Sequence, residues 1–260
     1  MRVLLHLLGK KTPFRVIETH AGLGVYDLTS DAANRTQEWR EGIGRLMVSN
    51  PTDVAKKLLE PYLALVRAKN PQNDLRTYPG SPEIARMLCR AQDRMIFCEL
   101  HSDDCAILQR NLAEDNRAKA IKIDGWTALK AYLPPKERRG IVLIDPAFEE
   151  PREFARLASG LEEAYQRWET GIFMLWYPIK KEDEVRAFEK RITKLAIPKI
   201  LHIEFSVGAE RKTDALSACG LIIVNPPWTL EEEMKSLMPA LVASLGHNDK
   251  GRYRLAWLAL

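Results

Sequence analysis

FRVIETHAGLGVY, residues 14–26, is the stretch from which the rest of the fold can be inferred. A short apolar run with β-branched residues ends in an acid, Glu18, and a turn containing Gly22 and Gly24 follows at once. This order predicts a strand that enters a glycine turn at the carboxyl edge of an α/β sheet. Glycine lets the backbone approach a ligand, and Glu18 could accept a hydrogen bond from a cationic or hydroxylated one. A tight turn without a ligand is the alternative, because the pattern is short.

Strands and helices alternate in the second part of the chain. Three further strands, predicted at residues 95–99, 121–124 and 141–145, end in Glu99, Asp124 and Asp145. Helices are predicted at residues 103–116, 126–132, 154–169, 182–195 and 230–245, and strands at 172–177, 200–206, 221–224 and 253–258. These repeated units predict an α/β fold with a mostly parallel, doubly wound sheet, whose ligands bind beyond the carboxyl ends of the strands.

Two helices precede this alternation and indicate an insertion. Apolar residues at helical spacing predict helices at residues 31–46 and 53–69, the second capped by Thr52. In a plain dinucleotide-binding unit the ribose-binding acid follows the glycine turn by about 20 residues, whereas Glu99 lies 75 residues after Gly24. We therefore predict a helical subdomain at residues 29–76, inserted into a main domain of residues 1–28 and 77–260. It either selects the substrate or caps the structure.

The helix that follows this insertion begins near Ser81. Ser81 is predicted to be its N-cap and Pro82 its first residue, and the apolar spacing extends it to about Asp93.

The acids at the strand ends favour S-adenosylmethionine as the cofactor. Glu18 with the glycine turn would lie near the methionine end, Glu99 would bind the ribose hydroxyls, and Asp124 the adenine amino group. A nicotinamide site would use the same ribose contact, but the third glycine of its G-x-G-x-x-G motif is replaced here by Asp27, which would repel a pyrophosphate.

Asp145-Pro146-Ala147-Phe148, after the fourth strand, approximates the D-P-P-Y motif of amino-group methyltransferases. Asp145 and the Pro146 carbonyl can accept hydrogen bonds from an exocyclic amine, and Phe148 can stack on the base. Direct attack of the amine on the sulfonium methyl needs no covalent intermediate, and the chain has no Pro-Cys dipeptide for a carbon-5 pyrimidine mechanism. A strand that simply ends at a turn is the structural alternative.

Asn225-Pro226-Pro227-Trp228 matches that motif more closely, but it follows the seventh strand. The strand before Asp145 should lie beside the first strand, so we interpret Asn225 as a structural strand end, with Trp228 in the core or at the rim. Basic residues occur in two loops, Lys136, Arg138 and Arg139 in one and Arg211 and Lys212 in the other. They could contact phosphates or form a solvated surface.

Composition excludes several other classes of protein. The 260 residues are 46% hydrophobic and 28% charged, without an apolar run of about 18 residues that could cross a bilayer. Four cysteines show no C-x-x-C spacing and the histidines form no H-x-x-x-H pair, so we predict no metal site and a cytoplasmic protein with free thiols. The net charge of +4 and the pI near 8.8 permit an anionic partner without requiring one.

Short motifs are distributed along nearly the whole chain: Thr19-His20-Ala21-Gly22-x-Gly24-x-Tyr26, Arg35-Thr36-x-Glu38, Tyr78-Pro79-Gly80-Ser81-Pro82, Glu99-Leu100-His101, Asp124-Gly125, Arg138-Arg139-Gly140, Ile144-Asp145-Pro146, Leu175-Trp176-Tyr177-Pro178 and Asn225-Pro226-Pro227-Trp228. Together they resemble the motifs of the bacterial 23S ribosomal RNA (adenine-N6) methyltransferases, earlier described as proteins needed for catabolism of external DNA.

The resemblance implies a Rossmann-like class I methyltransferase fold and cofactor contacts at His20, Ser81, Glu99, Asp124, Gly125 and Asp145, with Asp145 also the catalytic acceptor. It implies that the partner is 23S ribosomal RNA, protein-free or in an early assembly intermediate, and we expect a monomer. A DNA adenine-N6 methyltransferase and a non-catalytic nucleic-acid-binding protein linked to use of external DNA remain the alternatives.

This chain departs from the family pattern in three ways. The family begins with a Tyr-Arg-His and Asn-His-Ala-Asp segment that leads to a Lys-His pair, and this sequence starts inside the helix that follows. We expect either that the natural start lies upstream or that this member is altered. Glu18 stands where Asp is usual, and Ala147 with Phe148 replaces Pro-Tyr. Both replacements keep the carboxylate, the backbone carbonyl and the aromatic face.

Overall fold

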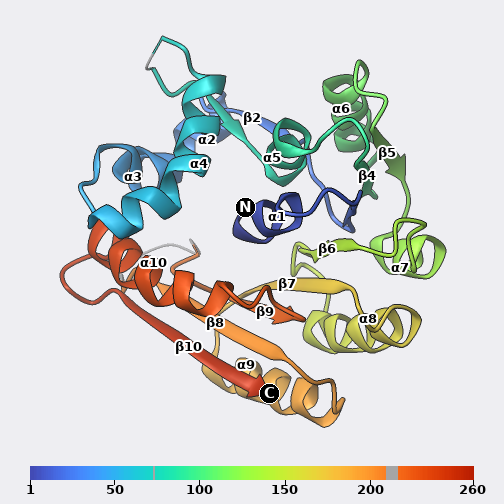
Figure 1. The fold of residues 1–260 in the computed structure, drawn as a ribbon. Helices are drawn as coiled ribbons and strands as arrows, with labels where there is room; N and C mark the ends of the chain where they lie inside the picture. Colours follow the sequence, from blue (N-terminus) through green and yellow to red (C-terminus); the bar gives the residue numbers. More distant parts are fainter. Residues whose placement is uncertain (73, 209–215) are drawn as a thin grey trace.

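A central eight-stranded sheet organises the computed structural model, which describes residues 1–72, 74–208 and 216–260. Its strands lie in the order β10-β8-β9-β7-β6-β1-β4-β5 (Figure 1). Their bounds are β1 (Arg15–Glu18), β4 (Arg94–Glu99), β5 (Ala118–Lys122), β6 (Gly140–Ile144), β7 (Ile172–Pro178), β8 (Ile200–Ser206), β9 (Ala218–Val224) and β10 (Arg252–Ala259). Neighbours from β5 to β7 are parallel, whereas β9 is antiparallel to β7 and β8, and β10 to β8. The predicted α/β, Rossmann-like fold class is confirmed.

Helices cover both faces of this sheet (Figure 1). Successive strand residues point to opposite faces, so Ile17 and Val16 of β1 belong to two different hydrophobic clusters. The cluster around Ile17 includes α7 (Gly125–Tyr132), α8 (Glu153–Arg167) and α9 (Glu182–Lys194). The cluster around Val16 includes α1 (Arg2–Leu8), α5 (Ser81–Leu88), α6 (Ser102–Leu112) and α10 (Leu230–Leu245). The central strands are therefore apolar on both faces, as parallel strands between two helical layers require.

A two-stranded ribbon joins the first glycine turn to a group of helices. β2 (Val25–Asp27) pairs antiparallel with β3 (Thr77–Pro79). Between them lie α2 (Asp31–Thr36), the π-helical turn η1 (Arg40–Gly44), α3 (Arg45–Val48) and α4 (Asp53–Lys69). As predicted, the Thr52 side chain caps α4. The apolar side chains of α3 and α4 pack against Leu237 of α10, beside which they lie in Figure 1.

The continuous helix predicted at residues 31–46 is wrong. α2 ends at Thr36, its C-cap residue Gln37 adopts a left-handed conformation, and the chain resumes as the π-helical turn η1 before α3. Gly42 and Gly44 weaken the α-helical preference of this segment. The π turn adds a residue to the helical repeat, and Ile43 and Leu46 are both buried in the cluster with Leu237.

Two other predicted boundaries are wrong. The strand predicted at residues 121–124 is β5, which ends at Lys122, because the Asp124 side chain caps α7. α5 ends at Leu88 instead of near Asp93. The Asp93 carboxylate accepts hydrogen bonds from the backbone N–H groups of Arg90 and Phe14, and so holds a turn ahead of β4. No helix in the described ranges is both long and apolar enough to span a membrane.

Candidate active site

Three of the predicted acids lie at one edge of the sheet. β1 is parallel to β4 on one side and to β6 on the other, so the carboxyl ends of these strands meet. Glu18 ends β1, Glu99 ends β4, and Asp145 follows β6 directly. The predicted position of the strand before Asp145, beside the first strand, is thus observed. Asp124 lies two residues beyond β5, where its Oδ2 accepts hydrogen bonds from the Thr127 N–H (2.8 Å) and Oγ1 (2.9 Å).

Glu18 is a buried carboxyl with a hydroxyl partner. It is 2% exposed, and its Oε2 accepts a hydrogen bond from Ser81 Oγ at 2.8 Å. Burial raises the pKa of Glu18 to about 8, partly opposed by this hydrogen bond. The prediction that Ser81 is an N-cap is wrong, since Gly80 holds that position and the Ser81 hydroxyl is directed to Glu18 instead of to a backbone N–H. Ser81 therefore belongs to the candidate site rather than to a helix cap.

Glu99 links the glycine turn to the end of its own strand. Its Oε2 accepts from the Gly22 N–H at 2.8 Å and its Oε1 from the His101 N–H at 2.9 Å. These bonds fix the carboxylate plane and leave further lone pairs for hydroxyl donors. Gly22 has φ of +59° and Gly24 of +76°, conformations that favour glycine. A Cβ on Gly24 would lie 2.8 Å from Leu108 Cδ1, so a larger residue there would strain the backbone and displace this buried side chain.

His20, just after β1, and Gly125, just after β5, lie in close contact. His20 Nδ1 is 2.8 Å from Thr19 Oγ1, and its ring meets Trp126 edge-on at a centroid distance of 5.5 Å. Burial lowers the pKa of His20 to about 4, so the imidazole is neutral near pH 7. A Cβ on Gly125 would lie 2.5 Å from the Thr19 carbonyl oxygen. No larger residue fits there without moving the backbone.

Asp145 and Phe148 stand at the end of β6. Burial raises the pKa of Asp145 to about 6, which leaves the carboxyl mostly ionised at pH 7. Phe148 has φ of +56°, and its ring is held edge-on by Phe154 at 5.0 Å and by Trp176 at 6.3 Å. Pro146, which lies between these two residues in the sequence, is buried. The motif thus presents a charged acceptor next to a supported aromatic ring.

Asn225 lies at the opposite edge of the sheet. β9 is antiparallel to β7, and its last residue, Val224, pairs with Phe173 near the start of β7. The Asn225 amide nitrogen donates to the carbonyl oxygens of Glu169 (2.7 Å) and Gly171 (2.8 Å). This placement agrees with a structural strand end. Of the two positions expected for Trp228, the core is wrong, since Trp228 is 85% exposed.

In the basic loop with Lys136, Arg138 and Arg139, one of the three side chains is held by hydrogen bonds within the fold. Lys136 and Arg138 are exposed, but Arg139 donates to the carbonyl oxygens of Thr12 and Leu7. Arg211 and Lys212 lie outside the described residues.

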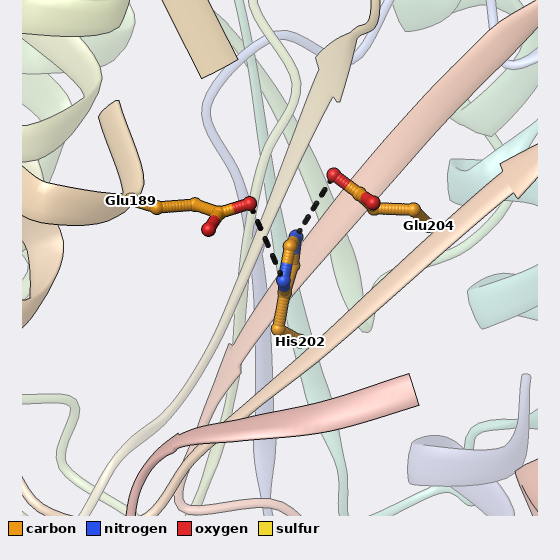
Figure 2. A group of neighbouring side chains, drawn as sticks. All are labelled: Glu189, His202 and Glu204. Atoms are coloured by element: carbon orange, nitrogen blue, oxygen red, sulfur yellow. Dashed lines mark ion pairs between the residues drawn. The ribbon is translucent and has the colours of Figure 1, made fainter. Parts of the chain in front are cut away.

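A buried polar cluster away from this edge was not predicted from the sequence. Figure 2 shows His202 between Glu189 and Glu204: its Nδ1 is 3.8 Å from one carboxylate and its Nε2 is 3.6 Å from the other. Tyr177 Oη bonds Nε2 at 2.5 Å. Arg254 Nη1 lies 2.7 Å from Glu189 and 3.9 Å from Glu204, so it supplies the positive charge. Burial lowers the pKa of His202 to about 4. The cluster connects α9, which carries Glu189, with β8 and with Arg254 of β10.

The comparisons with known proteins agree over the length of the chain. The family described as ribosomal RNA large subunit methyltransferase D, RlmJ, matches residues 11–259. Ribosomal RNA large subunit methyltransferase J of Escherichia coli is 38% identical, with 98% of this chain and 90% of that protein covered. The protein of the same name from Haemophilus influenzae is 37% identical, with 99% and 91% covered.

Solved structures are similar as well. The crystal structure of protein LPL1258 from Legionella pneumophila has a TM-score of 0.88 and 29% identity, with 98% of this chain and 92% of that chain covered. A probable spermidine synthase from Corynebacterium glutamicum has a TM-score of 0.51 and 11% identity, and the match covers 97% of this chain and 70% of the synthase. At this identity the similarity shows the fold alone. From the family match and the two curated relatives, the chain belongs to the RlmJ family of ribosomal RNA large subunit methyltransferases.

Proposed function

We propose that the chain transfers the methyl group of S-adenosylmethionine directly to N6 of an adenine in 23S ribosomal RNA. The observation that carries this function is the position of Asp145, which lies with Phe148 at the carboxyl end of β6, beside the strand that ends in Glu18. The relatives are named as ribosomal RNA large subunit methyltransferases, which supports ribosomal RNA as the substrate.

The residues at this edge have the chemistry that the cofactor requires. S-adenosylmethionine supplies an electrophilic sulfonium methyl group. The oriented Glu99 carboxylate suits the ribose hydroxyls, and Asp124 has its Oδ1 left for an amino group. Glu18, buried beside Ser81, suits the ammonium group of the methionine part, because a cation there compensates its burial. We propose as cofactor contacts Glu18, His20, Gly22, Gly24, Ser81, Glu99, Asp124, Gly125 and Asp145.

Asp145, Pro146 and Phe148 would orient the adenine. Asp145 and the Pro146 carbonyl accept one N6 hydrogen each, and the Phe148 ring supports the unstacked base. Bound there, S-adenosylmethionine would supply its methyl group to this nitrogen: the new nitrogen–carbon bond would replace the carbon–sulfur bond, whose electron pair would stay on sulfur, and the N6 proton would leave to solvent. Positive charge grows on the nitrogen in this step, and the Asp145 carboxylate stabilises it electrostatically.

The helical segment is best described as an insertion into the methyltransferase domain. Asp27 pairs with Thr77 in the ribbon of β2 and β3, which brings the two ends of the segment together. We therefore propose residues 1–28 and 77–260 as the methyltransferase domain and residues 29–76 as a helical subdomain. Unstacking of the target base is easiest in RNA that proteins do not yet cover. We propose protein-free RNA or an early assembly intermediate as the substrate, and a monomeric enzyme that works in the cytoplasm, where such RNA is made.

The test compares substrates for the same protein preparation. Calorimetry first measures binding of S-adenosylmethionine, and labelled methyl transfer is then followed on protein-free 23S ribosomal RNA, on assembled large subunits and on DNA of the same sequence. We expect labelling of the free RNA, with N6-methyladenine as the product. Cofactor binding without transfer to any substrate would contradict an enzymatic role, and preferential labelling of the DNA would identify a DNA adenine methyltransferase.

A further inference from the structure

A cavity, one wall of which is formed by Phe148, lies next to the Asp145 to Phe148 motif. Its volume is about 470 Å³, within the range of small-ligand pockets. Phe148, from the loop after β6, and Phe154, from the first turn of α8, give it an aromatic wall, and the buried Phe188 of α9 supports Phe154 at a centroid distance of 5.1 Å. Because Phe148 also supports the proposed base position at Asp145, a ligand in this cavity would be an immediate neighbour of the adenine that is methylated.

Glu153, the first residue of α8, lines this cavity and has one carboxylate oxygen without a hydrogen-bond donor among the described residues. It is 6% exposed, and its Oε1 has no hydrogen-bond donor within the part of the chain that the structure describes. Its Oε2 is 3.5 Å from Arg156 Nη1. Burial raises the pKa of Glu153. A buried acceptor without a donor is unfavourable, and the broad terminal torsion of glutamate lets the free oxygen turn towards the cavity at low cost.

The rim of the cavity carries cations that are free to bind phosphates. Arg152, Lys180 and Arg191 are exposed, and none has an ion-pair partner among the described residues. Glu150 and Glu184 line the cavity as well, so it is not a general anion site. The arrangement suits a ligand that combines a phosphate, an aromatic ring and an N–H donor, which is the chemistry of a nucleotide.

We propose that this cavity binds a second base of the RNA, adjacent to the target adenine and bearing an exocyclic amino group, with Glu153 as its acceptor. This inference rests on the proposed function, which makes RNA the substrate. Uracil is disfavoured, because its single N3–H lies between two carbonyl oxygens that would face the carboxylate. The aromatic wall stacks on any base, so Glu153 supplies the discrimination.

Binding of short RNAs tests this site directly. The wild-type chain is titrated into labelled UUAUU and into four variants in which one uridine is replaced by cytidine, and Kd is measured by fluorescence anisotropy. Cytidine has the size of uridine but carries an amino group in place of the 4-oxygen. We expect one of the four variants to bind about tenfold more tightly. Glu153→Met should abolish this preference, and Glu162→Met, an exposed carboxylate on the same helix, should retain it.

Two results would overturn the site: equal binding of cytidine and uridine at all four positions, or a preference that survives Glu153→Met. Methyl transfer to the same RNAs separates this inference from the proposed function. A preference that depends on Glu153, without methylation of any RNA, supports the second site and contradicts the enzymatic function. Methylation of these RNAs without any such preference supports the enzymatic function and contradicts the second site.

Discussion

Replacement of Asp145 by asparagine should remove most of the activity and leave the fold intact. The amide has the shape of the carboxyl but cannot stabilise the positive charge that develops on the adenine nitrogen. A hydrogen bond to a charged group contributes about 1.5–3 kcal/mol, and removal of one such electrostatic contact to a transition state lowers kcat about 10²–10³-fold. We expect a loss of that size at pH 7.5, measured as labelled methyl transfer to protein-free 23S ribosomal RNA at saturating cofactor.

The pH profile of the wild-type enzyme should report the ionisation of Asp145. Burial raises the pKa of Asp145 to about 6, so protonation below that pH removes the acceptor. kcat should be constant above about pH 7 and fall about tenfold per unit well below pH 6. The residual activity of Asp145→Asn should not show this dependence between pH 5 and 8.

A control at the other edge of the sheet makes the test decisive. Asn225→Ala changes the second, more closely matching motif, which the antiparallel β9 places at the opposite end of the strands from the carboxyl end of β6. Its kcat should stay within about threefold of the wild type, since no contact with the reacting amine is lost. An active Asp145→Ala enzyme together with an inactive Asn225→Ala enzyme would refute the assignment of the catalytic motif.

Three further predictions concern stability and cofactor binding. The folded pKa of Glu18 is about 8, above its ordinary value of 4.5, so the folded state binds more protons between these values and the free energy of unfolding should fall as pH rises through this window. In urea denaturation, Glu18→Gln should match the wild type near pH 5 and exceed it near pH 9 by at most about 5 kcal/mol, and an equal difference at both pH values would contradict the burial argument. Gly125→Ala should weaken S-adenosylmethionine binding at least tenfold in calorimetry, because its Cβ would displace the Thr19 backbone, and unchanged affinity would exclude a close approach there. Asn225→Ala should lower the free energy of unfolding by about 1–3 kcal/mol through loss of two hydrogen bonds to backbone carbonyls, and an unchanged urea midpoint would show that these bonds do not stabilise the fold.

Local sequence patterns were sufficient to predict most of the fold. The glycine turn after Glu18 and the apolar runs that end in Glu99 and Asp145 depend on neighbouring residues, and they predicted parallel strands whose acids meet at one edge. The structure has this arrangement. Local patterns failed where a competing backbone state was available, as in residues 31–46, where Gln37 adopts a left-handed conformation and a π-helical turn follows.

Contacts between distant segments decided the remaining features of the site. Ser81 has the sequence context of a helix cap, yet its hydroxyl donates to Glu18, 63 residues away. The free oxygen of Glu153 beside an aromatic wall depends on how the first turn of α8 packs against α9, which spacing along the chain does not encode.

The sequence by itself determined that four acids, among them Glu18 and Asp145, follow or end strands of an α/β sheet, because strand ends and turns are set by local chemistry. The order of strands along the chain also favoured the motif of Asp145 over that of Asn225 as the partner of the glycine turn of FRVIETHAGLGVY, but only the tertiary structure decided the direction in which the strand before each motif runs. The motif of Asp145 follows a strand parallel to β1, whereas that of Asn225 follows the antiparallel β9 and lies at the other edge. The physical reason is that the direction of a strand depends on its pairing with distant strands, and this pairing leaves little signal in the residues of the strand itself.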